Sequence, residues 1–237
     1  YFGRMAATVT DAALAHALGT DPAQPLLTFY DDATGERTEL SALTLANWAA
    51  KTANMIRDEF GLAAGDVIAV DAPVHWQTAA VLLGSWWAGI EVRVGADPDA
   101  GLAFVSQDRI DDAQAPEIAV LSLDPFALGV RDLPVGITDF ASTVRIHGDR
   151  FAPSDAPGPA LAGRSRDETI AAATEAVAGI EPGARLLSNR AWASADDVVA
   201  NLLAPWIGGA SLVQNRNGDP ALQEQRRIAE KVTLSWD

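Results

Sequence analysis

The chain has 237 residues, of which 49% are hydrophobic and 21% charged, and it contains no cysteine. This composition is typical of a globular protein with a sizeable core, and it excludes disulfides, thiolate metal sites and cysteine nucleophiles. The formal net charge of −15 opposes binding to nucleic acid and anionic membranes, and no basic patch offsets it. No apolar stretch is long and unbroken enough to cross a bilayer, and no secretory signal is evident. We therefore expect a cytoplasmic protein without membrane insertion.

The first 40 residues predict a helix followed by a hairpin. Residues 11–18 have a helical pattern that ends at Gly19. The runs LLTFY and ERTEL then flank the turn sequence Asp31-Asp32-Ala33-Thr34-Gly35, in which glycine can adopt a positive φ. This spacing indicates two antiparallel strands.

Residues 41–94 give the clearest pattern in the chain. Ser41 is expected to cap a helix that ends at Gly61, and VIAV is expected to form a strand buried on both faces. A second helix, from about His75 to Ala88, leads into the strand IEVRV. The region therefore predicts one β-α-β crossover of a parallel sheet.

The remaining elements divide into two groups around a break in the pattern. Before the break we expect strands at LAFVS and EIAVLSL and short helices at 107–113, 123–130 and 138–148. The stretch 152–163 is rich in proline and glycine and is expected to lack regular structure. After it, helices and strands alternate as in parallel sheets. We therefore predict an α/β fold with mostly parallel sheets, comprising a first lobe at 5–150, a connector at 151–164 and a second lobe at 165–237 that packs on the first.

The second helix of the crossover is apolar on most sides. Trp76, Leu83 and Trp87 share one face, whereas Leu82 and Trp86 lie on another. A helix that is apolar all round is buried in a large protein. Either the sheet of the chain itself covers both faces, or another subunit does. The pattern favours some self-association, as a homo-oligomer or with a protein partner.

The order of these elements resembles the opening of the adenylate-forming superfamily, which includes acyl-CoA synthetases, luciferases and peptide-synthetase adenylation domains. Members begin with a hairpin, a helix, the motif G-x-x-x-G-D-x-V-A-V and a helix closing in A-x-x-A-G. The matching residues in the first half are Leu40, Asn54, Gly61, Gly65, Asp66, Val67, Ala69, Val70, Ala88 and Gly89. A later family motif, L-L-x-P-L-x-x-G-A, is similar to Leu202, Leu203, Pro205, Gly209 and Ala210. The resemblance covers roughly residues 25–235 and consists of structural and core positions.

The chain departs from that family at its chemical motifs. The family carries a Ser/Thr/Gly-rich phosphate-binding loop with a lysine just before the helix that starts here at Ser165, and this chain has APSDAPGPALAGRSR instead. Catalytic members have an aromatic-His pair where this sequence has Ala193-Ser194-Ala195. The sequence ends at Asp237, before the later family motifs and the lysine of the C-terminal domain. The resemblance therefore implies a truncated, noncatalytic relative to which no family catalytic residue can be transferred.

The replaced loop contains one candidate site. Gly158 to Ser165 has the spacing G-x-x-x-x-G-[K]-S of a P-loop, with Arg164 in place of lysine. Pro159 removes one N–H donor and no strand signal precedes Gly158, so a connector leading into a capped helix is favoured. The alternative is a weak anion site at the helix N-terminus, formed by Gly163, Arg164 and Ser165.

Other polar residues are interpreted as structural. His75 follows a strand, where α/β folds often place ligands, but a polar cap of the next helix is favoured. His16 and His147 are expected at the surface. The pairs Asp31-Asp32, Asp111-Asp112 and Asp196-Asp197 fall in turns or first helical turns, which favour carboxylates without a metal.

Two functions remain open. The first is a pseudoenzyme that acts as a binding or regulatory module, for a nucleotide such as ATP or AMP, an acyl group or a protein. The second is an AMP-forming acid–thiol ligase fragment that activates an acyl or amino acid with ATP only when a partner chain completes it. Loss of a single preorganised charge-stabilising donor costs about 10²–10³ in rate, so the missing motifs favour the first function.

Overall fold

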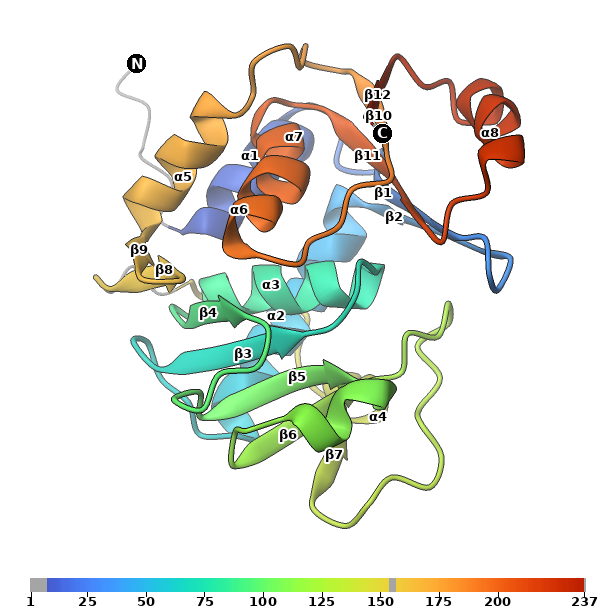
Figure 1. Cartoon of the computed structure of the whole chain (residues 1–237). Coiled ribbons are helices and arrows are strands. Elements are labelled where there is room, and N and C mark those ends of the chain that lie inside the picture. The colour runs from blue at the N-terminus through green and yellow to red at the C-terminus, as the bar shows by residue number, and fades with distance from the viewer. Residues whose placement is uncertain (1–7, 154–156, 237) are drawn as a thin grey trace.

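Two sheets organise the chain (Figure 1). The computed structural model describes residues 8–153 and 157–236, so the parts of the predictions that fall on 5–7, 154–156 and Asp237 lie outside it. Sheet A runs from edge to edge through β12 (Leu234–Trp236), β10 (Arg185–Ser188), β11 (Ser211–Arg216), β1 (Pro25–Asp31) and β2 (Glu36–Ser41). Only the β1–β2 hairpin is antiparallel.

Sheet B is also mostly parallel. Its order is β7 (Ile137–Asp139), β6 (Glu117–Leu121), β5 (Leu102–Ser106), β3 (Val67–Asp71), β4 (Glu91–Val94), β8 (Pro159–Leu161) and β9 (Arg164–Ser165). Only the β8–β9 pair at its edge is antiparallel. The predicted α/β class with mostly parallel sheets is confirmed.

The sheets do not follow the division of the chain at 151–164. In sheet A, β1 pairs in parallel with β11, with Leu27 opposite Leu212. The first hairpin of the chain therefore belongs to the same sheet as the last strands. The sequence predicted no regular structure at 152–163, but Pro159–Leu161 forms β8, which pairs with both β4 and β9. Proline is tolerated there because Pro159 is the first residue of the strand.

Helices cover and separate the sheets. They are α1 (Val9–Thr20), α2 (Ala42–Asp58), α3 (Trp76–Trp87), α4 (Phe140–Val144), α5 (Arg166–Glu175), α6 (Ala195–Val198), a π-helical turn (Val199–Leu203), α7 (Ala204–Ile207) and α8 (Gln223–Ala229). Short 3₁₀ helices span Gln107–Asp112 and Pro220–Leu222. Within the described residues, no helix combines the length and apolar character that crossing a bilayer requires.

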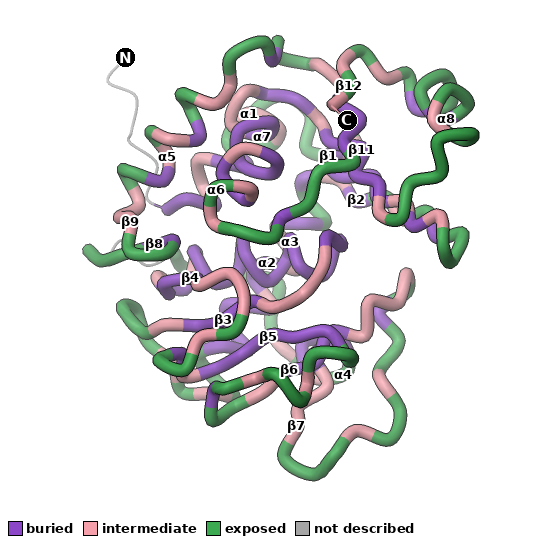
Figure 2. Tube along the Cα trace, in the orientation of Figure 1, coloured by how far each residue is buried: buried purple, intermediate pink, exposed green. Residues whose placement is uncertain are grey.

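Helices α2 and α3 lie between the sheets (Figure 1). Helix α2 contacts β1 and β2, and α3 contacts β3 and β4. Residues Trp76–Trp86 of α3 are all buried, as the purple trace in Figure 2 shows, and Trp87 is partly buried. The chain itself therefore covers this apolar helix, and α3 gives no reason for a second subunit at that place.

Local capping agrees with the sequence in most places. Ser41 caps α2 by accepting from the Thr44 amide, and Ser165 forms the predicted capping box with Glu168. The helix predicted at 123–130 is wrong, because Asp124 accepts from the amides of Phe126 and Leu128 and fixes a tight non-helical turn.

Candidate functional site

A two-residue turn closes the place where the resemblance puts a phosphate-binding loop. Strands β8 and β9 pair with Leu161 opposite Arg164, so only Ala162 and Gly163 connect them. Both have positive φ, +48° and +82°, which is the geometry of a type I′ turn. The segment with the P-loop-like spacing, Gly158 to Ser165, therefore forms a β-hairpin whose turn is Ala162-Gly163.

The donors of this turn are already bonded. The Ala162 amide donates to the Val92 carbonyl at 2.9 Å, and the Gly163 amide donates to the buried Glu91 carboxylate at 2.7 Å. The Arg164 guanidinium pairs with Asp196 at 2.6 Å. The Ser165 amide and hydroxyl both bond Glu168 at 2.8 Å. Carboxylates of the chain thus occupy the donors of Gly163, Arg164 and Ser165, and an external anion at this place stays a prediction.

A cavity of about 510 Å³ lies where the carboxyl ends of strands from both sheets meet. We call it the inter-sheet cavity. Its wall contains residues that end or follow β3, β4, β5, β10 and β11, namely Val70, Asp71, Ala72, Pro73, Val74, Val94, Gly95, Ser106, Asp108, Arg109, Ala191, Trp192, Ala193 and Arg216. Parallel α/β sheets characteristically bind ligands at this edge.

The charges of the cavity come from two arginines and two aspartates. Arg109 lies 3.9 Å from Asp108, and Arg216 lies 3.8 Å from the buried Asp31 behind the wall. A hydrogen bond from Ser106 to Asp108 lowers the pKa of that carboxyl, helped by the charges of Arg109 and Arg216 and opposed by partial burial. In the described residues, Asp71 forms no ion pair. The cavity therefore offers both signs of charge beside an apolar wall.

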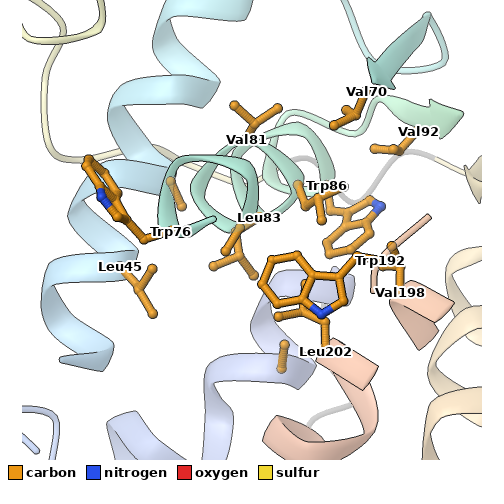
Figure 3. Packing of buried hydrophobic residues seen from close by; sticks show 14 of the residues in the cluster. Leu45, Val70, Trp76, Val81, Leu83, Trp86, Val92, Trp192, Val198 and Leu202 are labelled. Atoms are coloured by element: carbon orange, nitrogen blue, oxygen red, sulfur yellow. The ribbon is translucent and has the colours of Figure 1, made fainter. Parts of the chain in front are cut away.

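The apolar wall is anchored in the main core. Figure 3 shows the Trp192 indole packed among Trp86, Val198 and Leu202. Trp192 is buried, and its neighbour Ala193 belongs to the segment that the resemblance aligns with the aromatic-His pair of that family. At this point of the wall the side chain is a methyl group with no capacity for acid–base chemistry.

His75 lies behind the cavity and serves as a helix cap. Its Nδ1 accepts from the Gln77 amide at 3.1 Å, which confirms the capping interpretation and places the proton of the neutral ring on Nε2. Nε2 faces the buried Glu36 carboxylate at 3.4 Å. Burial lowers the pKa of His75, against the opposing influence of Glu36. The ring therefore links the β1–β2 hairpin to the start of α3.

The other predicted residues are dispersed. Asp32 pairs with Arg226, and Asp31 accepts from the side chain of Asn217. The side chain of His147 is mostly buried rather than at the surface, facing Asp58 and Glu59. Among residues 8–153 and 157–236, no group of three or more metal-ligating side chains is close enough to hold an ion.

The sequence did not single out Asp71, Arg109 or Arg216. A signal was nevertheless available, because Asp71 and Arg216 directly follow the predicted strands VIAV and ASLVQN, and Arg109 closely follows LAFVS. The sequence does not give the order of the strands in the two sheets, and this order decides which strands have neighbouring carboxyl ends.

Comparison with known proteins identifies a relative by sequence and acyl-CoA synthetases with a similar fold. No protein-family model matches the chain. A curated relative from Mycobacterium tuberculosis, a "TIGR03089 family protein", is 48% identical over 236 residues, covering 95% of this chain and 97% of the relative. An acyl-CoA synthetase structure from Brucella canis has a TM-score of 0.75 at 19% identity, over 96% of this chain. The anthranilate CoA ligase AuaEII, solved in complex with anthranoyl-AMP, has a TM-score of 0.72 at 14% identity, over 97% of this chain.

The two structural neighbours are much longer proteins. The chain spans 46% of the Brucella synthetase and 49% of the ligase, about half of each, and its fold matches the N-terminal region of acyl-CoA synthetases. At these identities the likeness concerns the fold. The curated relative matches in both identity and length, and the chain therefore belongs to the TIGR03089 family, with an acyl-CoA synthetase-like fold.

Proposed function

We propose that this protein is a noncatalytic relative of acyl-CoA synthetases that binds a small ligand in the inter-sheet cavity, as a binding or regulatory module in the cytoplasm. The observation that carries the proposal is the two-residue turn at Ala162-Gly163. A phosphate cradle needs several free backbone amides that converge on one anion. Both amides of this turn are bonded within the protein, to Val92 and Glu91.

The ligand class follows from the wall of the cavity. Arg216 and Arg109 offer guanidinium groups, which suit carboxylates, and Val70, Val74 and Trp192 offer apolar surface. Its volume of about 510 Å³ lies within the range of small-molecule sites. A small organic acid fits this chemistry, and the structural neighbours named for acyl-CoA and anthranilate ligation support it by analogy.

A second function has one observation in its favour. Because the chain spans about half of each synthetase, a partner chain could supply the rest of an active site, giving a ligase that activates an acid with ATP only in the complex. The second function requires a partner chain, and self-association as a homo-oligomer is a separate proposal. Light scattering over a range of concentrations tests self-association, and a strict monomer at high concentration would count against a homo-oligomer.

Thermal melting tests the binding proposal. We expect benzoate or anthranilate to raise the Tm of the protein, since a ligand at 100 times its Kd adds about 2.7 kcal/mol. MgATP and AMP should leave the Tm unchanged. Arg216→Met should reduce the shift caused by the acid. A large shift with ATP, which Arg216→Met leaves intact, would instead support a retained nucleotide site.

A further inference from the structure

A second, larger cavity lies at the opposite end of sheet A and is independent of the proposed function. Its volume is about 620 Å³, within the range of ligand sites. It lies at the amino ends of β1, β10 and β11, between the end of α1 and the residues that follow α8. Leu26, Trp206 and Ala210 give it a buried apolar wall. We call it the basal cavity.

Two of its three cations are committed to one buried carboxylate. Glu230 accepts hydrogen bonds from Tyr30, Arg37 and Arg185. Burial opposes the ionisation of Glu230, but these bonds outweigh it and lower the pKa of the carboxyl to about 2. Arg37 also pairs with Glu39 at 2.7 Å. The two guanidinium groups are therefore occupied by the protein itself.

The third cation is Lys231, whose ammonium group has no hydrogen bond or ion pair within the described part of the chain. It is one of only two lysines in the sequence. The other, Lys51, bonds the carbonyls of Arg145 and His147. The imidazole of His16, which also lines the cavity, likewise forms no hydrogen bond among the described residues. The lining also contains the carboxylates of Asp21, Glu39 and Glu230. Lys231 is the cation of the basal cavity that no described carboxylate contacts, and it lies with the free His16 ring beside an apolar wall.

The backbone of Lys231 is strained. Its amide donates to the Ile228 carbonyl and the Val232 amide to the Arg227 carbonyl, which closes α8 in a Schellman motif. Lys231 occupies the left-handed position of that motif, with φ +53°. Helices α3 and α7 end in the same pattern with Gly89 and Gly209 at this position. Lysine is therefore present at a position where two other helices of this fold have glycine.

We propose that the basal cavity binds a small organic anion, a carboxylate or a phosphate monoester with an apolar body. The Lys231 ammonium binds the anionic group, His16 offers a second polar contact, and Leu26, Ala210 and Trp206 contact the body. The conformational strain at Lys231 persists because glycine, which would relieve it, carries no charge.

The test uses octanoate and octyl phosphate as probes, with 1-octanol as the uncharged match. Amide NMR signals of Gly209 and Ser211, which line the basal cavity, report binding in every variant. We expect saturable shifts with both anions in the parent protein and in Lys231→Arg. Lys231→Met should weaken binding of the anions about tenfold or more, because a charge-assisted hydrogen bond is lost. Octanol should bind weakly, and with equal affinity to the parent protein and to Lys231→Met.

Two further variants keep the result decisive. Lys231→Gly should lose anion binding while the Tm rises by about 2–4 °C, since the strain is removed. Arg216→Met alters the inter-sheet cavity and should leave the shifts of Gly209 and Ser211 intact. Failure of the proposed function at the inter-sheet cavity can therefore be distinguished from failure of anion binding at the basal cavity. The proposal is overturned if neither anion shifts these signals, or if Lys231→Met or Lys231→Gly binds octanoate as the parent protein does.

Discussion

The Nε2 atom of His75 lies 3.4 Å from the Glu36 carboxylate, and both side chains are buried. Glu36 belongs to β2 of sheet A, whereas His75 caps α3 above sheet B. The ring also packs edge-on against Phe29, with centroids 4.8 Å apart. A neutral histidine thus connects the two halves of the core behind the inter-sheet cavity.

Burial of His75 predicts a loss of stability in mild acid. Burial lowers its pKa in the folded protein, so as the pH falls below 7 the unfolded chain takes up a proton more readily than the folded ring does. The free energy of unfolding should fall as the pH drops below about 6.5. Urea titrations at several pH values measure this slope.

His75→Asn is the matched variant for that slope. Asparagine keeps an acceptor for the Gln77 amide but does not titrate. Its unfolding free energy should depend less on pH between 7 and 5 than that of the parent. Equal slopes in the two proteins would show that His75 is not the titrating group.

Gly84 predicts a strong packing effect at the crossing of α2 and α3. A Cβ atom added at Gly84 would lie 2.6 Å from Thr52 Cβ and 2.8 Å from the Ala49 carbonyl. Gly84→Ala should therefore cost about 1–3 kcal/mol through overpacking. Gly19→Ala, in α1 with no atom within 4 Å, should instead stabilise by about 0.5–1 kcal/mol. Urea unfolding measures both, and a harmless Gly84→Ala would contradict the tight crossing.

Glu230 should be the most costly carboxylate to remove. Glu230→Gln leaves Arg37 and Arg185 without their shared partner, and because Arg37 is half exposed we expect a loss of about 2–4 kcal/mol at pH 7. The pKa of about 2 means that this stabilisation is present above about pH 4.5 and is lost as the pH falls toward 2. Asp58→Asn, in an exposed pair with Arg57, should leave the urea midpoint unchanged. A Glu230→Gln variant as stable as Asp58→Asn would refute this prediction.

The hairpin turn predicts a gain in stability. Ala162 has φ +48° before Gly163, and Asn-Gly is the favoured pair in a type I′ turn. Ala162→Asn should raise the free energy of unfolding by about 0.4–1 kcal/mol, measured by thermal melting. A lower Tm would argue that this segment is not a two-residue turn.

The sequence predicts the helices and strands of this fold better than it predicts which strands pair and which distant side chains meet. Ser41, Gly61 and Gly89 mark helix ends locally, so the crossover at 41–94 could be located from nearby residues alone. The pairing of β1 with β11 joins residues almost two hundred positions apart, and no local pattern encodes it. For the same reason the approach of Glu36 to His75 and the convergence of Asp71 with Arg216 required the structure.

Two errors in the predicted secondary structure arise from individual residues. The stretch 123–130 has apolar residues at helical spacing, but Asp124 bonds the amides that a helix would use. The prolines of 152–163 suggested a loop, yet Pro159 fits as the first residue of strand β8, a position where proline is tolerated. The lining of the basal cavity combines five separate chain segments, so its unpaired Lys231 could not be recognised from the sequence.

The most direct test of the central claim is ATP–pyrophosphate exchange with a panel of carboxylic acids. We expect the purified protein to show no exchange above background, because the turn at Ala162-Gly163 offers no free amides to a phosphate chain. A full-length acyl-CoA synthetase serves as the positive control. Acid-dependent exchange by this protein alone would contradict the noncatalytic function.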